Sequence, residues 1–196
     1  MADRPPVGAV AIRLVDMADA DEGAALVALR RAWVEERRGG PVDDPGFEAT
    51  LRAWLRAEAG QRLMWVAERT APANWYGDRV RRPPDRLPVR RGGPGGKGVL
   101  PTPDGPTAIG MLDMLDFRRM PGPGRPPGGW GYIGQAFVLA PHRDLGIGRM
   151  LLDEALAESR RRGYDRVVLS PTARSVPFYR RAGFRSADTL LVHPLD

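Results

Sequence analysis

The run Phe137-Val138-Leu139-Ala140-Pro141-His142-Arg143-Asp144-Leu145-Gly146-Ile147-Gly148-Arg149-Met150-Leu151-Leu152 decides how this 196-residue chain folds. It begins with apolar residues suited to a strand, passes through a turn with two glycines, and continues with the apolar spacing of a helix. Glycine lets a backbone approach a ligand without a Cβ in the way, and the first N–H groups of a helix have no partner inside it. The turn is therefore predicted to hold a phosphate, with Arg143 and Arg149 adding positive charge beside it.

Apolar periodicity predicts the remaining elements. We expect strands at 8–16, 63–67, 107–117, 131–139, 166–170 and 189–193, and helices at 24–38, 44–58, 146–162 and 175–182. The third and fourth strands are predicted to pair as an antiparallel hairpin, and the long helix after the fourth strand indicates a parallel connection to the fifth. This order predicts a mixed α/β fold with a mostly antiparallel central sheet flanked by helices.

A second motif follows the glycine turn by about thirty residues and indicates one family. The segment Ser175-Val176-Pro177-Phe178-Tyr179-Arg180-Arg181-Ala182-Gly183-Phe184 comes after the pattern Arg143-x-x-Gly146-x-Gly148. In this order and at this separation, the two motifs resemble those of the GCN5-related N-acetyltransferase (GNAT) family. The resemblance covers residues 130–185. It implies a single GNAT-like domain over residues 1–196 that transfers the acetyl group of acetyl-CoA to a primary amine by direct attack in a ternary complex.

The resemblance also implies roles for individual residues. The Tyr179 hydroxyl would donate a proton to the departing thiolate. Backbone groups at Phe137 and Val138 would bind the pantetheine arm and polarise the acetyl carbonyl, and the glycine turn would bind the pyrophosphate. This chain departs from the pattern at Thr172, where many relatives carry asparagine. The coenzyme-binding set implied by the resemblance is Phe137, Val138, Arg143, Leu145, Gly146, Ile147, Gly148, Arg149, Thr172, Ser175 and Phe178.

The general base and the acceptor are left open by the sequence. A small-molecule amine and a peptide amine are both compatible with the resemblance. Trp33 lies on a helix that borders the acceptor site in the family, although helical spacing alone is typical of a core tryptophan. His142 is interpreted as a polar surface residue of the turn, and His193 as structural. The candidates for a base or a water-positioning residue are Asp113, Asp116, Gln135, Glu35 and Glu36, and each carboxylate is more often a solvated surface charge.

The composition excludes several classes of site. The chain has no cysteine, which excludes disulfides and cysteine-based zinc sites, and its two histidines are too few for a histidine-rich metal centre. No metal is therefore predicted. No stretch approaches the roughly 20 apolar residues of a membrane span and no signal peptide is recognisable, so the expectation is a cytoplasmic protein without a membrane partner.

Residues 71–106 form a Pro/Gly/Arg-rich insertion, predicted to be either disordered or a lid. They hold eight of the twenty prolines, and seven basic residues against three acidic ones. This segment explains much of the formal charge of +6, which makes nucleic acid an unlikely partner. Gly92–Gly98 lacks the Ser or Thr after Lys97 and the preceding strand of a phosphate-binding loop.

Two other interpretations of the chain were weighed. A dinucleotide-binding turn is rejected because Leu151 stands where a third glycine belongs. A non-catalytic acetyl-CoA sensor, or a module that binds protein or RNA, stays open as an alternative to the enzyme. The enzyme is favoured because Tyr179 is present where the family places its proton donor. A homodimer is compatible with the resemblance.

Overall fold

The structure, a computed structural model, describes residues 10–19, 22–69, 107–124, 128–187 and 190–193. Every predicted helix is present, and so are the first five predicted strands. The predicted insertion at 71–106 lies outside the described residues. The elements are β1 (Val10–Leu14), α1 (Gly23–Arg38), α2 (Phe47–Glu58), β2 (Arg62–Arg69), β3 (Thr107–Arg118), β4 (Gly129–Val138), the short 3-10 helix η3 (Ala140–His142), α3 (Ile147–Arg161), β5 (Tyr164–Leu169) and α4 (Val176–Arg181).

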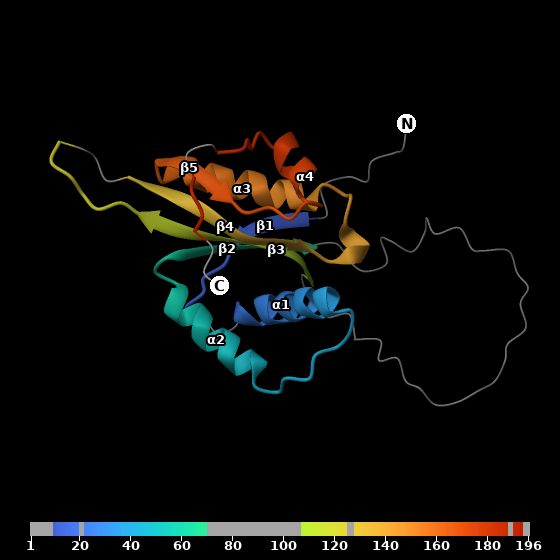
Figure 1. Cartoon of the computed structure of the whole chain (residues 1–196). Coiled ribbons are helices and arrows are strands. Elements are labelled where there is room, and N and C mark those ends of the chain that lie inside the picture. Colours follow the sequence, from blue (N-terminus) through green and yellow to red (C-terminus); the bar gives the residue numbers. More distant parts are fainter. Residues whose placement is uncertain (1–9, 20–21, 70–106, 125–127, 188–189, 194–196) are drawn as a thin grey trace, which may run out of the picture.

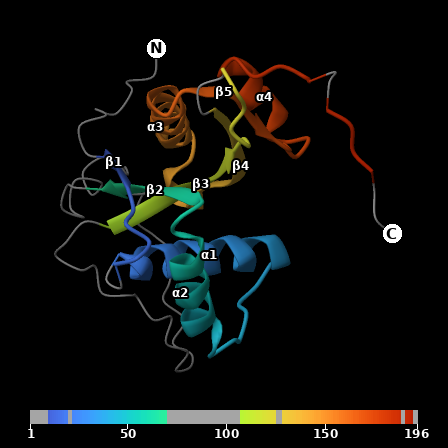
Figure 2. The same cartoon turned by 90° about the vertical axis from the view of Figure 1, so that its left-hand side faces the viewer.

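The described strands form one sheet in the order β1-β2-β3-β4-β5. Neighbours from β1 to β4 are antiparallel, whereas β4 and β5 are parallel. Both features confirm the predicted mixed sheet, including its β3–β4 hairpin. Helices α1 and α2 cover one face of the sheet, and α3 and α4 lie on the other (Figures 1 and 2). The sheet is thus the middle of three layers.

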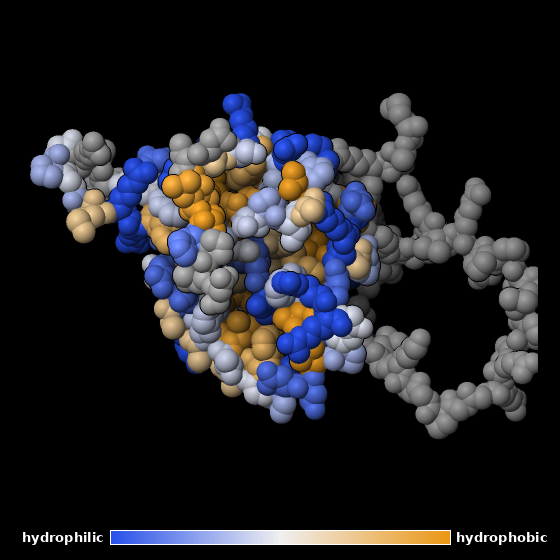
Figure 3. All heavy atoms as spheres, in the orientation of Figure 1, coloured by the Kyte–Doolittle hydropathy of each residue, from blue (hydrophilic) through white to orange (hydrophobic). Residues whose placement is uncertain are grey.

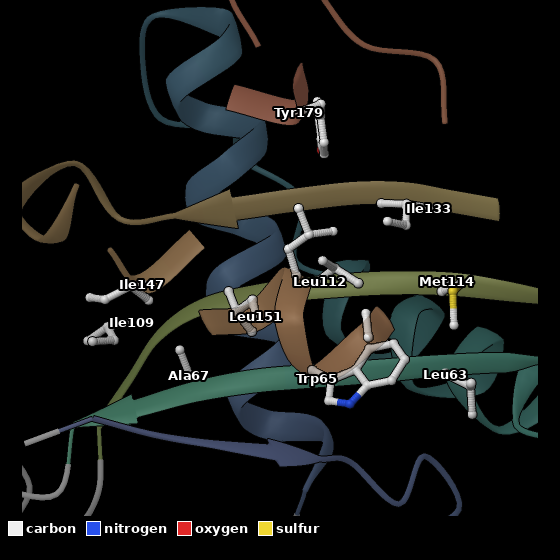
Figure 4. Packing of buried hydrophobic residues seen from close by; sticks show 12 residues of the cluster. Leu63, Trp65, Ala67, Ile109, Leu112, Met114, Ile133, Ile147, Leu151 and Tyr179 are labelled. Carbon is white, nitrogen blue, oxygen red and sulfur yellow. The ribbon is translucent and has the colours of Figure 1, made fainter. Parts of the chain in front are cut away.

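Burial on both faces follows from the alternation of side chains along the strands. In β2, Trp65 belongs to the apolar cluster packed by α3, whereas Met64 and Val66 belong to the cluster beneath α1 and α2. Figure 4 shows the first cluster, to which Leu151 of α3, Leu112 of β3 and Trp65 of β2 all belong. Burying a leucine of this kind stabilises the fold by roughly 1.5–3 kcal/mol. These clusters fix β3 and β4 between two helical layers.

The predicted last strand, 189–193, is wrong for the part that the structure describes. Residues 190–193 have no strand assignment, and Leu191 and Val192 are 94% and 80% exposed. Figure 2 shows the run after α4 leaving the body of the molecule. The apolar pattern of this run suits a strand, but a strand also needs an edge with which to pair. Among the described residues, β5 pairs only with β4.

Candidate functional site

Strand β5 ends before β4 does. Their pairing stops at Ile133 and Leu169, while β4 continues to Val138. Just after β4, the Leu139 N–H donates to the carbonyl of Ile109, on the β3 side, over 2.9 Å. Backbone groups of successive residues point to opposite sides of a strand, so the Val138 N–H points away from β3. It faces the side on which β5 no longer runs.

Phe137 is oriented differently from Val138. A Cβ built on Gly110 of β3 would lie 3.0 Å from the Phe137 carbonyl oxygen, so this carbonyl faces β3. The Phe137 side chain is buried in the cluster beneath α1 and α2. Of the two backbone positions expected to face a pantetheine arm, the geometry favours Val138.

The chain reverses direction between β4 and α3 through an unusual turn. Asp144 has φ +62°, a left-handed value rarely adopted by a residue with a Cβ, and Gly146 has φ +84°. α3 begins at Ile147, with Gly146 as its N-cap and no side chain bonded to its first N–H groups. The turn therefore presents backbone donors and the positive end of the helix dipole together. This is the local structure predicted for a phosphate site.

Gly148 lies between two other predicted site residues. A Cβ built on it would be 3.7 Å from the ring of Phe178 and 3.9 Å from a methyl group of Val138. Leu145, Phe178 and Val138 all pack against the apolar cluster that contains Ile147. The structure thus brings β4, the turn, the first turn of α3 and α4 together at one place.

The two arginines of the turn are engaged with protein groups. Arg143 donates from Nε to the Val138 carbonyl over 2.9 Å, and its Nη2 binds both carboxylate oxygens of Glu36 at 2.6 and 2.7 Å. Arg149 binds Asp153 through two contacts of 2.8 Å. Neither guanidinium is held as an isolated charge beside the turn. Arg143 instead joins the turn and the end of β4 to α1.

Tyr179 is buried on α4, where its ring meets Phe178 and Phe184 edge to face. Figure 4 shows it on the α3 side of β4, in the same cluster as Ile147. Burial raises the pKa of its hydroxyl. A raised pKa keeps this phenol protonated at neutral pH, which a proton donor requires.

Thr172, which is exposed, and Ser175, which is half-buried, hold the turn before α4. Their hydroxyl oxygens lie 3.1 Å apart, and the Ser175 hydroxyl donates to the Thr172 carbonyl over 3.0 Å. Pro177 is in the first turn of α4, where its missing N–H removes no helical hydrogen bond. These two hydroxyls therefore form hydrogen bonds within the turn itself.

The carboxylates proposed as bases all have partners. Asp113 is buried and forms an ion pair with Arg62, and burial raises its pKa more than Arg62 lowers it. Asp116 is paired with Arg118 and Arg162. Glu36 is bound by Arg143, and Glu35 accepts the Val42 N–H over 3.3 Å. The structure thus gives these four side chains structural contacts and selects none of them as a base.

Gln135 and Trp33 lie in one side-chain network on the α1 side of the sheet. The Arg30 guanidinium donates to Gln135 and lies 4.2 Å from the centre of the Trp33 ring. Arg37 lies 4.8 Å from the same ring. Sequence reasoning missed the contacts of Arg30 with Gln135 and of Arg62 with Asp113, because these partners are 105 and 51 residues away.

A groove of about 950 Å³ runs beside β5, on the side away from β4. Tyr179 lines it, but no residue of the predicted coenzyme-binding set does. Apolar surface is visible at the level of β5 in Figure 3. No residue of β4 or of the turn before α3 lines this groove.

Comparison with known protein families assigns the part of the chain that contains this turn to one family. The model of the "Acetyltransferase (GNAT) family" matches residues 63–184. The chain belongs to the GNAT acetyltransferase family. GNAT acetyltransferases use acetyl-CoA, so acetyl transfer is the general chemistry supported for the chain. A search of curated proteins found no match.

Solved GNAT structures share the fold. A predicted acetyltransferase from Clostridium acetobutylicum, solved with acetyl-CoA, has a TM-score of 0.59 at 16% identity, covering 94% of this chain and 96% of that one. A GCN5-related N-acetyltransferase from Ralstonia eutropha JMP134 has a TM-score of 0.55 at 23% identity, covering 95% and 98%. AAC(6')-Iy, bound to the bisubstrate analogue CoA-S-monomethyl-acetylneamine, has a TM-score of 0.56 at 14% identity, covering 95% and 98%. At these identities the likeness shows the fold alone.

Searches for other kinds of site gave two further findings. Within the described ranges, no group of three or more histidine or acidic residues could hold a metal ion. No helix among the described residues has both the length and the apolar character to cross a membrane.

Proposed function

We propose that the chain is an N-acetyltransferase that moves the acetyl group of acetyl-CoA to a primary amine by direct attack in a ternary complex. The observation that carries the proposal is that β4 continues beyond Ile133 without β5 as a partner and leads into the turn before α3. Gly146 and Gly148 leave that turn clear of side chains at the point where a pyrophosphate would approach the backbone. The residues present fit the coenzyme.

In this mechanism, the chain supplies an N–H donor and a proton. The Val138 N–H would donate to the acetyl carbonyl, whose oxygen gains negative charge as the amine attacks. A preorganised donor of this kind is worth roughly 2.7–4 kcal/mol in acyl transfer. The Tyr179 hydroxyl, kept protonated by burial, would give its proton to the thiolate as the carbon–sulfur bond breaks. The attacking nitrogen would release its extra proton to solvent, and solvent would return a proton to the Tyr179 phenolate.

The family and its neighbours support acetyl transfer, but the acceptor is not identified by them. The bisubstrate analogue bound to AAC(6')-Iy shows one small-molecule acceptor class in that protein. For this chain the acceptor is proposed to be an amine on a small molecule or peptide. A homodimer stays a prediction.

Calorimetry with acetyl-CoA is the first test of the proposal. Wild type should bind at micromolar concentration, and Gly148→Trp should abolish binding, because the new side chain would meet Phe178 and Val138 and fill the approach to the turn. Gly60→Trp is the matched control, since a Cβ there meets nothing within 4 Å. Circular dichroism would establish that each variant is folded.

The outcomes separate the enzyme from its alternatives. Binding followed by thiol release in the presence of an amine would support the enzyme. Binding without turnover on any amine would favour a non-catalytic acetyl-CoA sensor. A folded wild type that does not bind acetyl-CoA would refute the assignment.

A further inference from the structure

Two arginines of α1 flank one tryptophan on the face of the sheet opposite to α3. The guanidinium carbon of Arg30 lies 4.2 Å from the centre of the Trp33 ring, and that of Arg37 lies 4.8 Å from it. Stacking on an aromatic face attracts a cation and restricts a long side chain. The two charges are therefore held near one another before any ligand arrives.

The nearby carboxylates do not neutralise this pair. Glu36 is held by both of its oxygens on Arg143, and Glu35 accepts a backbone N–H from Val42. Among the described residues, neither Arg30 nor Arg37 forms an ion pair. A local excess of positive charge results. Figure 3 shows blue, hydrophilic side chains over apolar surface at the level of α1.

Asp113 is a buried carboxylate that attracts Arg30 electrostatically, but it interacts with Arg62 as well. Arg62 forms the direct ion pair with it, and Arg30 acts on it only through space. Among the residues that the structure describes, Arg30 donates to one side chain, the neutral amide of Gln135. Two guanidinium groups thus face a single carboxylate, which leaves donors of Arg30 available.

The pair of Arg30 and Arg37 is connected through Gln135 to β4, the strand that carries Val138. Gln135 lies on β4 three residues before Val138, the residue whose N–H points away from β3. Arg30 therefore contacts the strand on which the acetyl carbonyl would be held. An acceptor that reaches Val138 from the α1 side would pass this pair.

We propose that Arg30 and Arg37 bind a carboxylate on the acceptor, so that the substrate is an amine that also carries a carboxylate, such as an amino acid. Guanidinium groups recognise carboxylates through paired hydrogen bonds. Polycationic amines would meet like charge at the same place and would be poor substrates. The inference rests on the proposed function and names the class of its acceptor.

Matched acceptors test the charge requirement. Initial rates would be compared for leucine, leucinamide and spermidine with saturating acetyl-CoA, at equal concentrations of the neutral amine. Leucine should give the highest kcat/KM, because only it carries a carboxylate. Equal or better rates with leucinamide and spermidine would overturn the inference.

Variants on one helix identify the residues responsible. Arg37→Gln should raise the KM for leucine by roughly tenfold, the effect of losing a hydrogen bond to a charged group. It should leave the KM for leucinamide and the Kd for acetyl-CoA unchanged. Arg38→Gln removes a neighbouring exposed charge without touching Trp33 and should change neither KM. An equal effect of both variants would overturn the inference.

A binding measurement keeps the inference separate from the proposed function. N-acetyl-leucine, the expected product, would be titrated against the free protein while tryptophan fluorescence is recorded, with Trp33→Phe identifying the signal of that residue. Saturable binding that weakens in Arg37→Gln and in Arg30→Lys supports the site even if no turnover is found. Failure of wild type to bind N-acetyl-leucine overturns it, whereas failure to bind acetyl-CoA refutes the enzyme.

Discussion

Gly134 of β4 faces Asp113 of β3 so closely that a Cβ built on Gly134 would lie 2.8 Å from the Asp113 Oδ2 atom. The strand register shifts here, because Gln135 is opposite Asp113 while Ile133 is opposite Met114. Gly134 is thus the extra residue of a β-bulge. Its missing side chain leaves room for the buried ion pair of Asp113 and Arg62.

Gly134→Ala should therefore destabilise the fold. The added methyl group must displace a buried carboxylate held by Arg62, and overpacking of this kind costs about 1–3 kcal/mol. The free energy of unfolding in urea would measure the loss. Gly122→Ala is the control, because a Cβ there meets nothing within 4 Å. A Gly134→Ala protein as stable as this control would contradict the packing described.

Arg62→Met should destabilise the protein more strongly, and the loss should depend on pH. Removing one partner of a buried ion pair costs about 3–5 kcal/mol, because the Asp113 carboxylate is left buried without its cation. Burial already raises the Asp113 pKa, and Arg62 lowers it, so the variant should raise that pKa further.

The sign of the pH effect follows from this shift. A carboxyl group with a higher pKa in the folded state contributes most to stability below its unfolded pKa of about 3.9, and loses that contribution as pH rises through the folded pKa. The deficit of Arg62→Met should hence be smaller at about pH 5 than at about pH 7 in urea denaturation. Arg161→Met, which removes an exposed partner of Glu158, should show a small and nearly constant deficit. A constant large deficit for Arg62→Met would contradict the shift.

Glu36→Gln should affect coenzyme affinity more than stability. The ion pair between Glu36 and Arg143 is partly exposed, and pairs of this kind contribute about 0–1 kcal/mol. It nevertheless orients Arg143, whose Nε binds the Val138 carbonyl. We expect the Kd for acetyl-CoA to rise about threefold by calorimetry, corresponding to less than 1 kcal/mol. Glu48→Gln, which removes an exposed pair on α2, should leave the Kd unchanged.

Local sequence patterns predicted most of the fold. The turn and α3 were predicted from the glycines at 146 and 148 and from the apolar spacing after them. This was possible because a turn and a helix are formed by residues that are close together in the sequence. The segment 190–193 has an equally apolar pattern but forms no strand. Strand formation depends on a partner edge far away in the sequence, which a local pattern does not report.

Long-range partners account for the rest of the differences. Arg143 was expected to add charge beside a phosphate, yet its guanidinium binds Glu36, 107 residues away. Asp113 was a candidate base, and its pairing with Arg62 spans 51 residues. Side-chain chemistry alone suggests what a charged residue can bind. The tertiary fold determines which partner it meets.

Tyr179→Phe tests the proposed proton donor while preserving the packing of the ring. Phenylalanine can keep the edge-to-face contacts with Phe178 and Phe184, so the fold and the Kd for acetyl-CoA should change little. Loss of a general acid typically lowers the rate by about 10²- to 10⁴-fold, and we expect kcat to fall by at least the lower value. Tyr132→Phe on β4 is the control and should retain kcat. The raised pKa of Tyr179 further predicts that ionisation of this phenol causes no fall in wild-type kcat below about pH 10, the ordinary pKa of tyrosine. If kcat is unchanged in Tyr179→Phe, the thiolate takes its proton from solvent, and the role of Tyr179 is limited to packing.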